Sequence, residues 1–144
     1  DCKNLYPFAD ATEENFTEVM LRIHQYLKPT PVGIIHIGQL SRGFLSYAKN
    51  AGVHLYDNKA DWRWTRENVS EYIKGGLIYG SPVLMLTWNT RVRELRNHWV
   101  VITGIRADDN EIRIVTSNWG YKKEYSLDEW IHAYSLYRGL NYFT

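Results

Sequence analysis

The sequence is poor in several features that define whole classes of protein. It has one cysteine, Cys2, in 144 residues, which excludes an internal disulfide framework and is compatible with a reducing compartment. No apolar run approaches the roughly 20 residues that a membrane-spanning helix needs. The formal net charge is +1, so there is no electrostatic argument for binding nucleic acid or an anionic membrane.

Signals for metals and serine nucleophiles are also missing. No pair of histidines has the H-x-x-x-H spacing with a glutamate that typifies a zinc site. We therefore expect no metal and no cofactor, and we interpret four histidines as core or surface residues: His24, His36, His54 and His132. Ser41 lacks the glycine-flanked elbow of a serine nucleophile. The sequence has no signal for an oligomeric state.

What the sequence does contain is typical of one globular domain with an aromatic-rich interior. Hydrophobic residues make up 44% and charged residues 23%, and this length can bury a real core. Aromatic residues reach 15%. Five tryptophans are expected either to fill the core or to line a substrate cleft: Trp62, Trp64, Trp88, Trp99 and Trp119.

Helical periodicity dominates the first half of the chain. The first predicted helix spans 16–27, has a capping signal at Asp10 or Thr12, and must end before Pro29. The second spans about 39–50 and stops at Gly52. A short third helix begins after Thr65 and is expected to close at two consecutive glycines, Gly75 and Gly76.

Strand patterns dominate the second half. A short strand is expected at 53–56, and longer ones at 83–88, 99–105, 112–116, 121–125 and 136–143, with a helix capped by Ser126 and Glu129 before the last. Helices followed by strands indicate the α+β class. The prediction is a single domain with a helical part, 1–76, and an antiparallel sheet of about five strands, 77–144.

A predicted hairpin brings two polar residues together. The strands 99–105 and 112–116 flank a polar turn from Ala107 through Asp108 and Asp109 to Asn110. If the hairpin closes near Asp108, positions 98 and 118 fall roughly opposite each other, and directly opposed side chains on one face have Cβ atoms about 4.5–5.5 Å apart. We therefore expect a ring nitrogen of His98 to meet the amide oxygen of Asn118. A histidine whose Nδ1–H is held by an asparagine oxygen is a general base that needs a nucleophile.

Three blocks of sequence resemble one family. They are GSPVLMLTWN at Gly80–Asn89, NHWVVITGI at Asn97–Ile105 and TSNWGYKKEYSLDEW at Thr116–Trp130. In order and content they are similar to the papain-like cysteine peptidases of the bacterial type related to bacteriocin-processing (double-glycine) peptidases. The resemblance implies a papain-like fold, hydrolysis of a peptide or protein substrate, His98 as general base and Asn118 as its orienting partner.

The nucleophile of that family has no match here. It lies in a helix-start motif like C-G-P-T/A-A that follows a glutamine, whereas Cys2 is followed by Lys3 and Asn4. The expectation is therefore that the chain begins downstream of the nucleophile segment, or that it is a catalytically incomplete relative. Cys2 is the alternative nucleophile, with Lys3 as the cation that would favour its thiolate.

Three functions stay open at this point. The first is a cysteine peptidase, and the second is a papain-like module that binds a peptide or protein partner without catalysis. The third is a peptidoglycan amidase with a similar Cys-His-polar layout. The arginines that precede His98 either rim a cleft or belong to a solvated loop: Arg91, Arg93 and Arg96.

Overall fold

The computed structural model describes residues 2–60, 63–108 and 110–144, apart from the side chain of Cys2. The expectations for Trp62, for Asp109 and for the thiol of Cys2 lie outside what is described. The chain divides into two compact units, Asp1–Asp57 and Asn58–Thr144. No helix in the described part of the chain is long and apolar enough to cross a membrane.

The first unit is helical, with a short 3-10 helix η1 (Cys2–Leu5), α1 (Glu13–Leu27) and α2 (Ile37–Asn50). Helix α1 is capped by Thr12, whose side chain accepts a hydrogen bond from the Asn15 backbone N–H at 3.2 Å. It ends at Lys28, which has a left-handed φ of 45° and is followed by Pro29. The predicted helix and its stop are confirmed, and Thr12 is the cap.

Helix α2 begins two residues before the predicted start because His36 caps it. The Nδ1 atom of His36 accepts a hydrogen bond from the Gln39 backbone N–H at 3.1 Å. The strand predicted at 53–56 is wrong. The backbone N–H of Val53 donates to the carbonyl of Ala48 at the helix end, so this segment continues the helix terminus and joins no ladder.

The second unit contains the sheet and two of the four α-helices. Its strands are β1 (Val83–Trp88), β2 (His98–Asp108), β3 (Glu111–Asn118), β4 (Tyr121–Ser126) and β5 (Tyr137–Asn141). Their order across the sheet is β4-β3-β2-β1-β5, and every pair is antiparallel. The predicted α+β class and five-stranded antiparallel sheet are confirmed.

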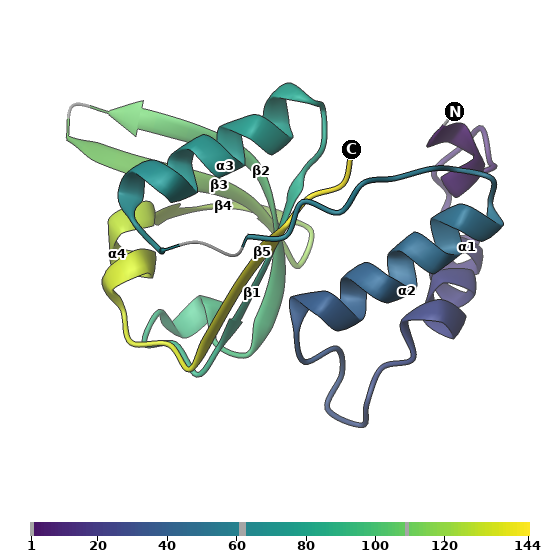
Figure 1. Cartoon of the computed structure of the whole chain (residues 1–144), viewed down its shortest axis with the longest axis horizontal. Coiled ribbons are helices and arrows are strands. Elements are labelled where there is room, and N and C mark those ends of the chain that lie inside the picture. The colour runs from purple at the N-terminus through teal and green to yellow at the C-terminus, as the bar shows by residue number, and fades with distance from the viewer. Residues whose placement is uncertain (1, 61–62, 109) are drawn as a thin grey trace. The chain divides into compact units, whose positions relative to one another are not determined.

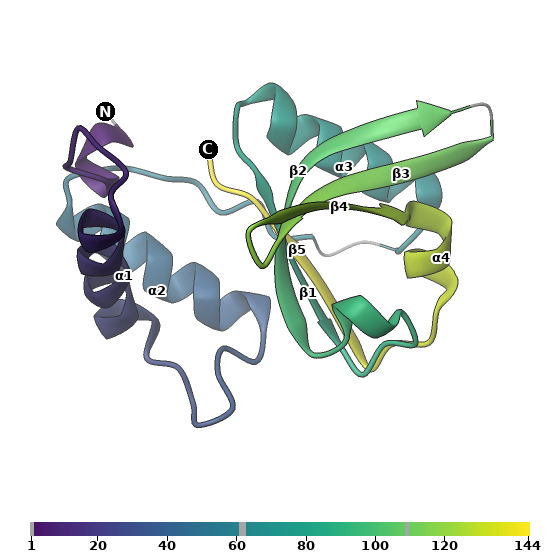
Figure 2. The ribbon, with the colours of Figure 1, turned by 180° about the vertical axis from the view of Figure 1, so that it is seen from behind.

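Helices α3 (Arg66–Ile78) and α4 (Leu127–His132) cover one face of this sheet (Figure 1), and Figure 2 shows the sheet from behind, with α3 beyond it. The core between these layers joins apolar residues of both helices to alternate residues of the strands, namely Val69, Ile73, Val83, Met85, Val100, Ile102, Ile114 and Trp130. The indole N–H of Trp130 donates to Thr87 Oγ1 at 3.1 Å, so the one polar atom of this buried ring is satisfied.

Strand β1 is buried on both faces, as its apolar run predicts. Met85 and Leu86 are consecutive, so their side chains lie on opposite faces of the sheet, and both are almost fully buried. The strand lies between β2 and β5, which protects both of its edges.

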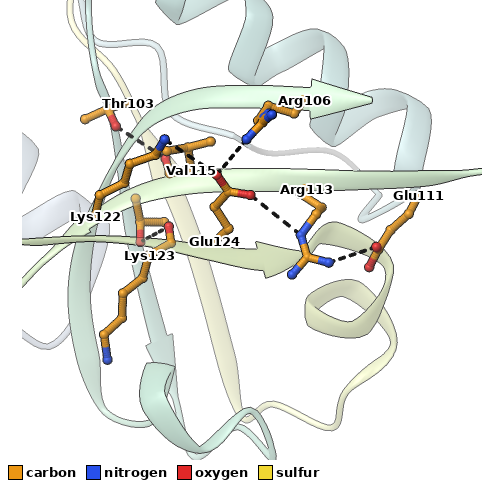
Figure 3. A network of polar contacts seen from close by, with 9 residues as sticks. Thr103, Arg106, Glu111, Arg113, Val115, Lys122, Lys123 and Glu124 are labelled. Carbon is orange, nitrogen blue, oxygen red and sulfur yellow. Dashed lines mark hydrogen bonds and ion pairs between the residues drawn. The ribbon is translucent and has the colours of Figure 1, made fainter. Parts of the chain in front are cut away.

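The face of the sheet opposite α3 carries ion pairs across three strands (Figure 3). The Glu124 carboxylate accepts a hydrogen bond from Arg106 at 3.0 Å and lies 3.6 Å from Lys122 Nζ and 3.8 Å from Arg113 Nε. Figure 3 also shows the amine of Lys123 directed away from this cluster. Side chains alternate along a strand, so β4 presents Lys122 and Glu124 on one face and Lys123 and Tyr125 on the other.

Helix α3 continues through the two glycines that were expected to end it. A Cβ atom on Gly76 would lie 2.8 Å from Val83 Cγ2 and 3.0 Å from Tyr142 Cγ, so this glycine permits close packing of the helix on the sheet. The helix instead ends at Tyr79, before Gly80, whose φ is 70°. The predicted stop at Gly75 and Gly76 is therefore wrong, because the absence of a Cβ serves packing there.

The two adjacent glycines of α3 provide a matched pair of variants. We expect Gly76→Ala to lower the free energy of unfolding by about 1–3 kcal/mol through overpacking. Gly75→Ala should raise it by about 0.5–1 kcal/mol through helix propensity, because its added Cβ meets only Tyr142 Oη at 3.4 Å. Urea unfolding followed by tryptophan fluorescence measures both, since all six tryptophans lie in the second unit. Equal effects of the two substitutions would contradict this packing argument.

Candidate functional site

His98 is held at the start of β2 by a clamp between two asparagines. It pairs with Thr87 across the ladder from β1. The connection between these strands begins at Asn89 and ends at Asn97, with left-handed φ values of 49° and 54°, a conformation that asparagine adopts more readily than most residues. The Asn97 Oδ1 atom accepts a hydrogen bond from the Asn89 backbone N–H at 2.8 Å, which closes the loop just before His98.

Asn118 is the last residue of β3 and is 2% exposed. Val101 pairs with Ser117, so the same register carried one residue further puts Asn118 opposite Val100. His98 and Asn118, predicted to lie roughly opposite each other, are therefore offset by two residues along the ladder. A shift in register between Ile102 and Gly104 displaces the strands relative to a regular hairpin, and His98 becomes the diagonal neighbour on the same face.

The side chains of this diagonal pair meet. His98 Nε2 lies 2.8 Å from Asn118 Oδ1, which is hydrogen-bond distance. The nitrogen differs from the expected one, because the asparagine binds Nε2 and not Nδ1. Nδ1 makes no hydrogen bond to the residues that the structure describes. Among the two ring nitrogens, Nδ1 is therefore the one that these contacts leave open to a further group.

Trp119 covers one face of the His98 ring. The two rings are stacked, with centroids 4.9 Å apart and planes 11° from parallel. Trp119 and Gly120 have φ values of 53° and 77° and connect the paired residues Asn118 and Tyr121, which is the geometry of a type I′ hairpin turn. A left-handed conformation costs an ordinary residue about 1–2 kcal/mol, and here it coincides with the stack.

Asn118 links His98 to three further residues. Its Nδ2 donates to Tyr125 Oη at 2.9 Å, and Tyr125 Oη donates to Glu94 Oε2 at 2.9 Å. The same carboxylate oxygen accepts from Lys123 Nζ at 2.9 Å. Glu94 lies in the short 3-10 helix η2 (Arg93–Leu95), between β1 and β2. Four separate segments thus contribute to one hydrogen-bonded chain, which we call the Glu94–His98 relay: Glu94, Lys123, Tyr125, Asn118 and His98.

The charges in the relay are set by its own contacts. Hydrogen bonds from Lys123 and then Tyr125 hold the pKa of Glu94 below its usual value. The hydrogen bond to Glu94 raises the pKa of Lys123. Loss of solvation is the main cause that raises the pKa of Tyr125, with a further contribution from Glu94. At neutral pH Glu94 is therefore an anion, Lys123 a cation and Tyr125 a neutral phenol.

Sequence reasoning identified His98 and Asn118. It missed the other three residues of the relay, which are Glu94, Lys123 and Tyr125. The alternating segment YKKEY (Tyr121–Tyr125) could have placed Lys123 and Tyr125 on one face of β4. Glu94 had no such signal, because it lies in an irregular connection. Of the three arginines expected near the site, Arg96 donates from Nε to the Thr90 carbonyl at 2.9 Å and so stabilises its own loop.

Other sequence candidates have structural roles or lie elsewhere. Ser41 donates a hydrogen bond to the Asp57 carboxylate, and Trp64 packs edge-on against Trp130. Within the described ranges, no group of three or more His, Cys, Asp or Glu side chains is placed to hold a metal ion. A cavity of about 510 Å³ in the first unit is lined by residues that include Arg22 and Tyr47, and none of the relay residues lines it.

The two neighbouring lysines of β4 allow a test of the relay's electrostatics. Lys123→Met should raise the pKa of Glu94 toward its usual value, because it removes the largest cause of the lowering. A carboxyl group with a lowered pKa stabilises the fold above its usual pKa and loses that contribution as pH falls through its folded pKa. Carbon-13 NMR titration of the glutamate carboxyls measures the pKa of Glu94. Lys122→Met is the control, since Lys122 pairs with Glu124, and an equal effect on Glu94 would contradict the assignment.

Trp119 should be dispensable for the turn and necessary for the stack. Trp119→Asn provides the Asn-Gly sequence that type I′ turns favour. Asparagine adopts the left-handed backbone conformation at a lower free-energy cost than tryptophan does, and this difference offsets the lost aromatic contact. We therefore expect the free energy of unfolding to change by less than about 1 kcal/mol. The His98 ring protons should lose their upfield ring-current shift in NMR spectra. Trp119→Phe is the control that keeps a ring, and destabilisation by more than about 2 kcal/mol in Trp119→Asn would contradict the turn argument.

Comparisons with known proteins add no relative to this picture. No protein-family model matches the chain, and neither a curated protein nor a solved structure matches it. The geometry around His98 is therefore the basis on which a function is assigned.

Proposed function

We propose that this chain is a papain-like domain of the cysteine-peptidase type, in which His98 is the general base and Asn118 its orienting partner. The observation that supports this most strongly is the 2.8 Å contact between His98 Nε2 and Asn118 Oδ1. It joins the ends of two neighbouring antiparallel strands, at the residues that match the family-like sequence blocks. Hydrolysis of a peptide bond is the reaction that the resemblance implies.

The proposed reaction uses Nδ1 of His98. Nδ1 takes the proton of a cysteine thiol, and the thiolate attacks the carbonyl carbon of the substrate. The resulting imidazolium donates from Nε2 to Asn118 Oδ1 and from Nδ1 to the leaving amine, which departs as the acyl-enzyme forms. Nδ1 then takes a proton from water as the hydroxide attacks the thioester, and it returns that proton to the thiolate.

The surroundings of His98 suit this role. Asn118 is almost fully buried, so water does not compete strongly for its amide oxygen. Trp119 lies flat on the imidazole and shields one face of the ring. Asn118 orients the ring without adding a second negative charge, which suits a base that becomes cationic only during the reaction.

The nucleophile of the proposed reaction is a cysteine thiol. Cys2 is the one cysteine in this sequence, so the thiol comes either from Cys2 or from residues outside these 144. A non-catalytic module that binds a peptide or protein partner is the second candidate. It is favoured by the aromatic surface beside the site, where Trp119 is 80% and Tyr121 71% exposed, because exposed aromatic side chains are common at protein interfaces.

Thiol reactivity separates the two candidates. In a cysteine-peptidase site, a cysteine should react with iodoacetamide near neutral pH faster than a free thiol does, because the histidine stabilises its thiolate. His98→Ala should slow that reaction by about 10²-fold, the lower end of typical general-base contributions. The rate is measured against pH on this chain and, where the natural protein extends beyond Asp1, on that longer protein.

A second histidine serves as the control. His132 lies in α4, where Nδ1 is 2.8 Å from the Asp128 carbonyl oxygen, and His132→Ala should leave the alkylation rate unchanged. If no cysteine reacts faster than a free thiol, and His98→Ala has no effect, the peptidase proposal fails. Binding of peptides that is lost in Trp119→Ala would then support the non-catalytic module.

A further inference from the structure

The chemistry of the groups in the Glu94–His98 relay determines which of them donates and which accepts in each hydrogen bond. A phenol can donate or accept a hydrogen bond, and an asparagine amide can be turned over to exchange its oxygen and nitrogen. Tyr125 and Asn118 are therefore each compatible with two arrangements when considered alone. Only a group that cannot reverse its role decides between them.

Glu94 is such a group. An ionised carboxylate only accepts hydrogen bonds, and Lys123 Nζ at 2.9 Å keeps this carboxylate ionised. Tyr125 Oη, 2.9 Å from Glu94 Oε2, must therefore direct its single proton toward Glu94. Its oxygen can then only accept a hydrogen bond from Asn118.

The donor and acceptor roles of Tyr125 also fix the orientation of the Asn118 amide. The atom that faces Tyr125 must be a donor, so it is Nδ2, at 2.9 Å from Tyr125 Oη. The amide oxygen consequently faces His98. Turning the amide over would set its oxygen against the phenol oxygen with no proton between them. Asn118 is almost fully buried, so water could not relieve that repulsion.

His98 is the last residue of the relay. Because Asn118 Oδ1 is an acceptor, His98 Nε2 at 2.8 Å must carry a proton. Neutral imidazole has one N–H, so Nδ1 is left with its lone pair. That is the nitrogen to which the proposed reaction assigns the proton transfer.

We propose that Glu94 is a positioning residue that fixes the tautomer of His98 through Tyr125 and Asn118, so that Nδ1 is the basic nitrogen. The catalytic use of this tautomer rests on the proposed function, whereas the tautomer itself exists without a nucleophile or substrate. Glu94 touches no reacting atom and acts only through the relay. The alternative is an ordinary exposed ion pair with Lys123, which would leave the tautomer unaffected.

The ring nitrogens of His98 report the answer directly. Nitrogen-15 NMR of histidine-labelled protein, at a pH where His98 is neutral, identifies which nitrogen carries the proton. The parent chain should show the Nε2–H form alone. In Glu94→Gln the amide can donate to Tyr125 as well as accept, so the direction of the relay is no longer fixed and an Nδ1–H population should become directly observable beside the Nε2–H form.

Two further variants make the test specific. Tyr125→Phe interrupts the relay while keeping the Glu94–Lys123 pair, and it should produce the same rise in the Nδ1–H form. Glu124→Gln is the matched control, because Glu124 binds Arg106, on the opposite face of β4. Its His98 resonances should equal those of the parent. The side chain of Glu94 is 56% exposed, so its replacement by glutamine is compatible with folding.

The inference is overturned if His98 stays entirely in the Nε2–H form in both Glu94→Gln and Tyr125→Phe. It is also overturned if Glu124→Gln changes the tautomer as much as Glu94→Gln does. Failure of thiol activation alone would remove the peptidase proposal and leave the tautomer result intact. The two proposals can therefore fail separately.

Discussion

The register of β2 on β3 is the constraint on which the candidate site depends. Because side chains alternate between faces, a slip of one residue would place His98 and Asn118 on opposite sides of the sheet. The register shift between Ile102 and Gly104 makes the pair diagonal neighbours on one face, and the hydrogen bond between Thr87 and Trp130 ties the adjoining strand to the core. Core packing and strand pairing together hold the two side chains 2.8 Å apart.

The two faces of strand β4 carry different sets of charged and hydrogen-bonded contacts. On one face Glu124 forms ion pairs with Arg106 and Lys122 at the surface, where water and salt screen the attraction between the charges. On the other face Lys123 and Tyr125 both bind Glu94, and Tyr125 accepts a hydrogen bond from the nearly buried Asn118. The first set lies at the surface, where water can replace a partner. The second set fixes the orientation of the Asn118 amide, because burial prevents water from replacing a wrongly oriented partner there.

Local signals in the sequence predicted most of the regular structure. Thr12, Thr65 and Ser126 cap the helices as expected, because a cap depends on residues only three positions apart. The errors occurred where distant contacts decide. Helix α3 passes through Gly76 because Val83 and Tyr142 need the space of its missing side chain. The segment 53–56 has a strand pattern but no strand to pair with.

The sequence by itself determined the α+β order and the two strands of the hairpin, because these follow from short-range periodicity and turn chemistry. It also singled out His98 and Asn118, but these residues share one face of the sheet only because of the register shift between Ile102 and Gly104. Only the tertiary structure decided which imidazole nitrogen meets the asparagine, and that Tyr125 and Glu94 lie behind it. Those relations join η2, β2, β3 and β4, and no sequence period connects an irregular loop to the far end of a hairpin. The strand register and the packed core bring them together.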